Sequence, residues 1–232
     1  MDKILAADDL VGVSFFIISM ALIASTAFFW LERYDVKGKW RTSITVSGLV
    51  TMVAAIHYYY MRDVWIATGT SPTVYRYIDW LITVPLLMIE FYLILRAVAE
   101  VSVGIFWRLL IGTVIMLVFG YLGEAGTINT TLGFVIGMLG WAYILYEVFF
   151  GEASKVNAAT ANASCQQAYK AMQWIVLVGW AIYPIGYVMG YMTSSASPES
   201  LNIIYNLADF INKIGFGLVI WAAAKKDSEA SA

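Results

Sequence analysis

Almost all of this 232-residue chain is divided into apolar runs that are each long enough to cross a lipid bilayer. A helix needs about 20 apolar residues to cross a hydrocarbon core of roughly 30 Å. Seven such runs lie between charged or Gly/Pro-rich breaks, at about 10–31, 43–61, 74–95, 105–123, 130–150, 171–192 and 201–224. The runs are continuously apolar rather than alternating, which predicts helices and not a barrel.

Composition supports a single membrane domain. Hydrophobic residues make up 61% of the chain and charged residues 13%, whereas a soluble domain is roughly half apolar and a quarter charged. Seven spans with short links use nearly the whole length, and no repeat or linker divides it. We therefore expect one all-α membrane domain over residues 1–232. No basic stretch suits nucleic acid, and one cysteine with one histidine offers no metal site.

Lysine and arginine residues outside the runs predict the orientation of the chain. Two, Lys3 and Arg62, lie on the side of the N-terminus. Ten lie on the opposite side: Arg33, Lys37, Lys39, Arg41, Arg96, Arg108, Lys155, Lys170, Lys225 and Lys226. The positive-inside rule then places the N-terminus outside and the C-terminus in the cytoplasm. This arrangement requires an odd number of spans, in agreement with seven.

Five ionisable side chains fall inside the apolar runs: Arg76, Asp79, Glu90, Asp209 and Lys213. A charge at the bilayer centre costs at least about 2.5–3.5 kcal/mol on insertion scales, so each needs a partner or a function. Asp209 and Lys213 are four residues apart and share one face of a helix. Asp79 and Glu90 also share a face, roughly 16 Å apart along the axis. Ion pairs that only fasten helices together do not explain this spacing.

The charges predict different roles for the acids. Two cations, Arg76 and Lys213, would be balanced by Asp79 and Asp209. Glu90 has no basic neighbour in the sequence and is flanked by apolar residues, so desolvation should keep it protonated. An ionised carboxylate beside a cation and a second, neutral carboxyl group form a proton acceptor and a proton donor.

Three stretches resemble helices of the microbial rhodopsins. Residues 76–90 resemble the third helix of that family, residues 179–186 the sixth, and residues 205–213 the seventh, which attaches retinal. The closest resemblance is to the green-absorbing proteorhodopsins, marine bacterial proton pumps, and it covers nearly the whole chain.

The resemblance implies a role for each intramembrane charge. Lys213 would bind all-trans retinal as a Schiff base. Asp79 would be the primary counterion and proton acceptor, and Asp209 the second counterion. Arg76 would organise the extracellular side, and Glu90 would be the proton donor from the cytoplasmic side.

The resemblance also implies a set of pocket residues. The residues expected along the polyene are Trp80, Trp180, Tyr183, Pro184 and Tyr205. Leu87 matches the position that tunes colour in proteorhodopsins, which implies green absorption. His57 matches the histidine beside the counterion, where it would stabilise the ionised carboxylate.

Four further side chains have simpler interpretations. The sequence leaves open whether Tyr58 packs between helices or lines the retinal pocket. Glu124 and Glu147 lie near span ends, where solvated caps explain them. Cys165 is expected in a polar link over residues 152–167.

The sequence therefore predicts a light-driven outward proton pump, a transporter and not an enzyme, that crosses the bacterial inner membrane several times. The family implies a homo-oligomer, a pentamer or hexamer. A photosensor is the main alternative, although sensors often lack a carboxylate at the position of Glu90. An acid at position 79 disfavours a chloride pump, and Asp79, Thr83 and Glu90 do not match a sodium pump. A retinal-free transporter would more often show duplicated halves, and a hydrolase would need a nucleophile with its base.

Overall fold

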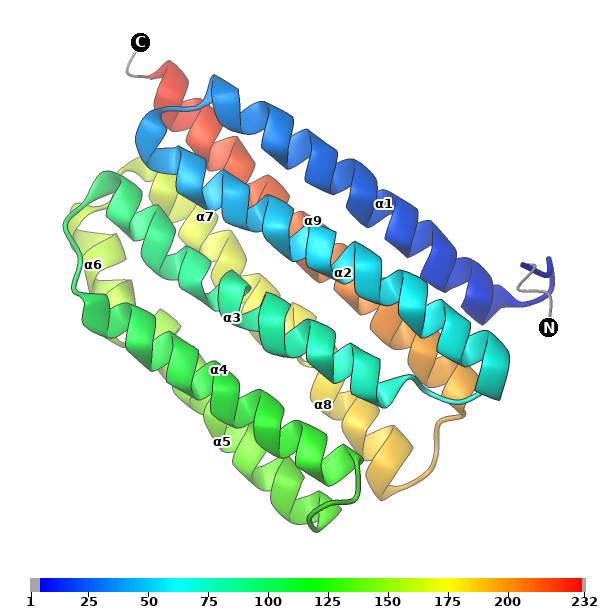
Figure 1. The fold of residues 1–232 in the computed structure, drawn as a ribbon. Helices are drawn as coiled ribbons and strands as arrows, with labels where there is room; N and C mark the ends of the chain where they lie inside the picture. Colours follow the sequence, from blue (N-terminus) through cyan, green and yellow to red (C-terminus); the bar gives the residue numbers. More distant parts are fainter. Residues whose placement is uncertain (1–4, 231–232) are drawn as a thin grey trace.

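The computed structural model describes residues 5–230 and is helical throughout, without strands in that range (Figure 1). Its elements are α1 (Leu10–Glu32), η1 (Arg33–Asp35), η2 (Gly38–Trp40), α2 (Arg41–Thr68), α3 (Thr73–Val98), α4 (Val103–Glu124), α5 (Thr130–Phe149), α6 (Glu152–Thr160), α7 (Ala163–Trp174), η3 (Ile175–Gly179), α8 (Ile182–Tyr187), η4 (Val188–Met192) and α9 (Pro198–Glu229). Seven helical runs are long and apolar enough to cross a membrane. The seven predicted spans are confirmed, in the predicted order.

The helices extend past the apolar runs because local signals, and not hydropathy, end them. The helix α2 continues to Thr68 and stops at Gly69, which adopts the left-handed backbone conformation with φ of 64°. Glycine carries no Cβ and reaches this conformation without strain. The helix α9 begins at Pro198, and the side chain of Ser197 accepts a hydrogen bond from the backbone N–H of Ser200 as its N-cap.

The prediction of a polar link over residues 152–167 is wrong. Most of this stretch is helical, in α6 and the first turn of α7. Alanine and glutamine favour helices, and Asn162 caps α7 by accepting a hydrogen bond from the backbone N–H of Cys165 at 3.0 Å. Cys165 is consequently buried and not in a solvated loop.

The spans form a closed ring. Consecutive spans pack against each other, and α9 packs against α1. The first and last residues of the ribbon lie at opposite ends of the bundle (Figure 1). We call these the N-terminal end and the C-terminal end. The spans α2, α4 and α7 begin at the C-terminal end, where α9 finishes. Lys3, one of the two cations counted on the N-terminal side, lies outside the described residues.

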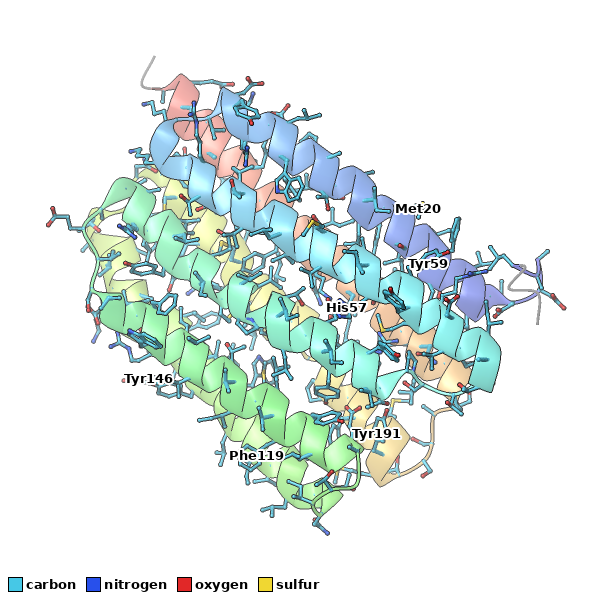
Figure 2. All side chains as sticks on the ribbon, in the orientation of Figure 1. Met20, His57, Tyr59, Phe119, Tyr146 and Tyr191 are labelled. Atoms are coloured by element: carbon cyan, nitrogen blue, oxygen red, sulfur yellow. The ribbon has the colours of Figure 1, made fainter. Side chains whose placement is uncertain are left out.

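The outer surface along the spans is apolar and aromatic, whereas the ionisable side chains in the middle of the spans lie inside. Met20, Tyr59 and Tyr146, labelled in Figure 2, have exposed fractions of 41%, 49% and 59%. Asp79 and Glu90 are fully buried. Ionisable residues that face the bundle interior are the arrangement expected of a chain in lipid.

The sixth span is not a continuous α-helix. Two π-helical segments, η3 and η4, lie on either side of α8, which contains Pro184. Segments of π-helix often occur at functional sites because they change which side chains face the interior. Trp180 and Tyr183 lie between the two segments, and the ring of Tyr183 packs edge-on against Trp80 of α3.

Candidate functional site

Lys213 lies between two carboxylates in the middle of the bundle. Its Nζ donates a hydrogen bond to Asp79 Oδ2 at 2.6 Å and to Asp209 Oδ2 at 2.8 Å. The two acids come from different spans, Asp79 from α3 and Asp209 from α9, where the spacing of four residues turns Asp209 and Lys213 to one face. All three side chains are almost fully buried. Buried charges need such pairing to offset the loss of water.

Asp209 also accepts hydrogen bonds from three neutral donors. The donors are Tyr58 Oη at 2.8 Å, Tyr183 Oη at 2.6 Å and Trp80 Nε1 at 3.2 Å. Together with Lys213, these four donors hold the carboxylate as an anion, because hydrogen bonds to the charged form favour that form. The sequence did not decide whether Tyr58 packs between helices or lines the pocket. Its contact with Asp209 joins residues 151 positions apart, which no local pattern reveals.

Asp79 has a poorer set of partners. Its Oδ2 accepts from Lys213, but its Oδ1 accepts no hydrogen bond from the described residues. His57 was predicted beside this carboxylate. Its Nδ1 lies 4.0 Å from Asp79 Oδ1 and is bonded instead to the backbone carbonyl of Val53, at 2.9 Å. Figure 2 shows His57 on α2, near the middle of the span. The histidine is therefore near Asp79 without a hydrogen bond to it.

Within the described residues, Arg76 forms no ion pair with Asp79 or Asp209. Its Nη2 donates to Asn202 Oδ1 at 2.9 Å and to Asn206 Oδ1 at 3.1 Å, both on α9. The ring of Tyr205 lies 5.3 Å from the guanidinium carbon, within the range of cation–π attraction. The expected charge balance thus takes a different form, with Lys213 bonded to both acids and Arg76 held by two neutral amides.

Glu90 occupies a separate environment. It is fully buried, and its Oε1 accepts a hydrogen bond from Ser47 Oγ of α2 at 3.0 Å. No cation pairs with it among the described residues. Asp79 and Glu90 both face the interior from α3, in agreement with the predicted shared face. Leu87, which is 3% exposed, lies between them along the helix.

A mostly apolar cavity of about 110 Å³ adjoins Lys213. Five of the predicted pocket residues line it: Trp80, Leu87, Trp180, Tyr183 and Pro184. The sequence missed the wall that α4 and α5 contribute, which includes Met116, Gly120, Phe134, Gly137 and Trp141. These residues carry no charge and no distinctive motif. A Cβ at Gly137 would meet the backbone oxygen of Met116 at 3.2 Å, so this glycine lets α4 and α5 pack closely at the cavity wall.

Tyr205 was predicted in the cavity wall but does not line it. Its ring stacks against Tyr183 at 5.9 Å and lies edge-on to Trp80 at 5.7 Å. The residue therefore supports two wall residues from behind, because its position on α9 turns it toward the N-terminal end, where Arg76 lies.

Two acids near span ends are not solvated caps, and this expectation is wrong. Glu147 is 3% exposed and accepts two hydrogen bonds from Arg108, at 2.9 and 3.2 Å. Glu124 lines the cavity and accepts a hydrogen bond from Tyr77 Oη at 2.8 Å. Packing between neighbouring spans buries Glu147 and partly buries Glu124, which the sequence position alone does not indicate.

Comparison with known proteins agrees with this geometry. Residues 9–227 match the family model of the bacteriorhodopsin-like proteins. The chain is a member of this rhodopsin family. It is 56% identical to the green-light absorbing proteorhodopsin of Gamma-proteobacterium EBAC31A08 over 97% of this chain and 90% of that protein.

Two solved rhodopsin structures have the same architecture. The crystal structure of blue light-absorbing proteorhodopsin from Med12 is 53% identical, has a TM-score of 0.82, and is matched over 94% of this chain and 98% of that one. Xanthorhodopsin, a light-driven ion pump with dual chromophore, is 28% identical with a TM-score of 0.84, over 98% of this chain and 97% of that one.

Rhodopsins of this family bind retinal covalently through a lysine. The residues around the cavity fit that cofactor. Lys213 is the only lysine in the wall among the described residues, and the wall is otherwise mainly apolar and aromatic, as a polyene requires. Asp79 and Asp209 supply negative charge beside the Nζ atom, where a positive charge would be held.

We expect Lys213→Ala to prevent formation of a coloured pigment, because the variant removes the amine beside the cavity. The measurement is visible absorption after addition of all-trans retinal to membranes that contain the variant. Lys170→Ala, which changes an exposed lysine of α7, serves as the control and should give the wild-type band. A normal visible band in Lys213→Ala would contradict the assignment.

Proposed function

We propose that this rhodopsin is a light-driven outward proton pump whose retinal is attached to Lys213. It would work as a single membrane domain over residues 1–232, with the N-terminus outside and the C-terminus in the cytoplasm. The excess of lysine and arginine at the C-terminal end supports that orientation. Kinship with proteorhodopsins and the buried ionisable groups support transport and not turnover of a soluble substrate.

The observation that carries the proposal is the unequal environment of the two acids beside Lys213. Asp209 is held as an anion by three neutral donors in addition to the lysine. Asp79 receives a hydrogen bond from Lys213 and has one oxygen without a donor among the described residues. Protonation therefore removes fewer stabilising hydrogen bonds at Asp79 than at Asp209. This supports Asp79 as the proton acceptor and Asp209 as the permanent counterion.

When bound, retinal supplies light absorption and an isomerisation that changes the position and acidity of the proton held at Lys213 Nζ. That proton has a short path to Asp79 Oδ2, which lies 2.6 Å away. Such a distance permits direct transfer between heavy atoms. The hydroxyl and indole donors around Asp209 keep that acid ionised and preserve one negative charge beside Nζ.

The return of a proton to Nζ would come from Glu90. This acid lies three turns from Asp79 along α3, toward the C-terminal end. Its burial without a cation favours the neutral, proton-carrying form. The buried side chains of Thr83 and Leu87 lie between the two acids along α3. Separation of acceptor and donor on opposite sides of Lys213 gives transport its direction.

Arg76 and His57 would assist on the N-terminal side. The Arg76 guanidinium, fixed by Asn202 and Asn206, places a positive charge on the route by which a proton leaves Asp79. That positive charge repels a proton near Asp79 and so favours release of the proton to the outside. His57, 4.0 Å from Asp79, is close enough to stabilise the ionised acid through a modest side-chain movement.

The proposals for absorption colour and oligomeric state rest on similarity to related proteins. Leu87 lines the cavity, and the leucine at this position, together with the green-light absorbing relative, supports a green-absorbing pigment. We further propose that the chain resides in a bacterial inner membrane as a pentamer or hexamer.

Asp79→Asn should shift the absorption band to the red and abolish proton transport. Loss of the negative charge beside Nζ reduces the stabilisation of a positive charge at that atom, and an amide cannot take its proton. Absorption spectra and photocurrents across a planar bilayer measure the two effects. Asp35→Asn, at a carboxylate with an exposed side chain of 64%, is the matched control. Outward current that survives in Asp79→Asn would remove Asp79 from the acceptor role.

Glu90→Gln should slow the second half of the photocycle by roughly a hundredfold or more, the usual contribution of general acid catalysis. The first half, in which the proton leaves Nζ, should keep its rate, because Glu90 does not contact Lys213. Flash-induced absorbance changes resolve the two phases. If both phases are unchanged, Glu90 is a structural residue and not the donor.

A further inference from the structure

A single carboxylate joins three segments at the C-terminal end of the bundle. Asp227, near the end of α9, accepts a hydrogen bond from Trp40 Nε1 at 2.7 Å through Oδ2 and from Asn162 Nδ2 at 2.5 Å through Oδ1. Lys39 Nζ lies 3.6 Å from the same Oδ2. Asp227 is 7% exposed, and Trp40 is fully buried. The acid thereby ties the starts of α2 and α7 to the last turns of α9.

The first of these attachments, at Trp40, lies on the same helical face as the serine that contacts Glu90. Trp40 precedes Ser43 by three residues and Ser47 by seven, so the three side chains share one face of the helical run that begins at Gly38. All three are buried. Ser47 donates the hydrogen bond that Glu90 accepts. The face of α2 that touches Glu90 therefore ends at the side chain held by Asp227.

The second attachment covers the same region from α7. Asn162 donates to Asp227 through its Nδ2 and caps α7 through its Oδ1, so the amide is fixed at both ends. Cys165, in the first turn of α7, donates its S–H to the backbone carbonyl of Ile94 at 3.4 Å. Ile94 is one turn beyond Glu90 on α3. The start of α7 thus closes the bundle directly beyond Glu90.

Glu90 is fully buried, so a proton from the C-terminal side must pass the cover formed by the segments packed beyond it. The Asp227 contacts are the polar part of the cover, and water can replace their donors when the segments separate.

We propose that Asp227, Trp40 and Asn162 form a clasp that closes the cytoplasmic route to Glu90, and that its opening sets the rate at which Glu90 regains a proton. This proposal rests on the proposed role of Glu90 as donor. The three are positioning residues, which act on Glu90 through the segments that they hold.

Two variants test the clasp, and each removes one of the hydrogen bonds to Asp227. Trp40→Phe keeps an aromatic ring but removes the N–H that Asp227 accepts. Asn162→Ser keeps a side chain that caps a helix but is too short to reach Asp227. Each should speed the second half of the photocycle roughly threefold, the size expected from loss of one hydrogen bond. The first half, set by Lys213 and Asp79, should not change.

Glu32→Gln is the matched control. Glu32 Oε2 accepts a hydrogen bond from Trp221 Nε1 at 2.8 Å and lies 3.4 Å from Lys225 Nζ. It therefore fastens the same end of α9 to α1 and not to the starts of α2 or α7. This variant should leave both halves of the cycle at the wild-type rate.

Flash-induced absorbance changes, with a pH-indicator dye that reports proton uptake, measure the rates. Faster uptake in Trp40→Phe and Asn162→Ser, but not in Glu32→Gln, would support the clasp. Unchanged or slower uptake in the first two variants, or an equal effect in the control, would overturn it.

Amide hydrogen exchange separates failure of the clasp from failure of the proposed function. A wild-type chain that takes up retinal but shows no photocycle would refute the donor role without informing on the clasp. In that case exchange at residues 163–170 still reports whether Asp227 holds α7. Faster exchange in Asn162→Ser than in Glu32→Gln supports the holding contact, and equal exchange overturns it.

Discussion

The ammonium group of Lys213 between Asp79 and Asp209 is the interaction on which the rest of the site depends. A cation in the middle of a bundle in lipid requires anions at hydrogen-bond distance, and removal of one partner from a buried pair costs about 3–5 kcal/mol. The two distances, 2.6 and 2.8 Å, fix the register of α3 against α9. That register also places Trp80 against Asp209 and opens the apolar cavity beside the lysine.

The three buried acids differ in their hydrogen-bond partners, and in the proposed pump this difference gives proton transport its direction. Among the residues that the structure describes, Asp209 has four hydrogen-bond donors, Asp79 has one, and Glu90 has the hydroxyl of Ser47. An acid held as an anion, an acid that can accept a proton and an acid kept neutral are three states produced by burial and neighbours alone. In the proposed pump, the same carboxylate chemistry would serve as counterion, acceptor and donor. Arg76 adds a fixed charge on one side of this line, and the clasp at Asp227 closes the other.

The sequence predicted the fold well because lipid imposes simple rules, in which span length follows bilayer thickness and charges turn inward. Helical periodicity also predicted that Asp209 and Lys213 share a face. Contacts between distant segments could not be predicted in this way. The hydrogen bond from Tyr58 to Asp209, the hold of two asparagines on Arg76 and the position of Tyr205 behind the cavity wall depend on how whole spans rotate against each other. The α4 and α5 wall was missed because its residues carry no charge and no recognisable motif.

The most direct measurement is the external pH of an unbuffered suspension of cells that express the chain with added all-trans retinal under green light. The account predicts acidification on illumination that a protonophore abolishes, because protons leave Lys213 toward Asp79 and the outside. Coloured cells that show no acidification, or that become alkaline outside, would contradict outward pumping. In that event the retinal site would stand, and the chain would be a sensor or an inward transporter.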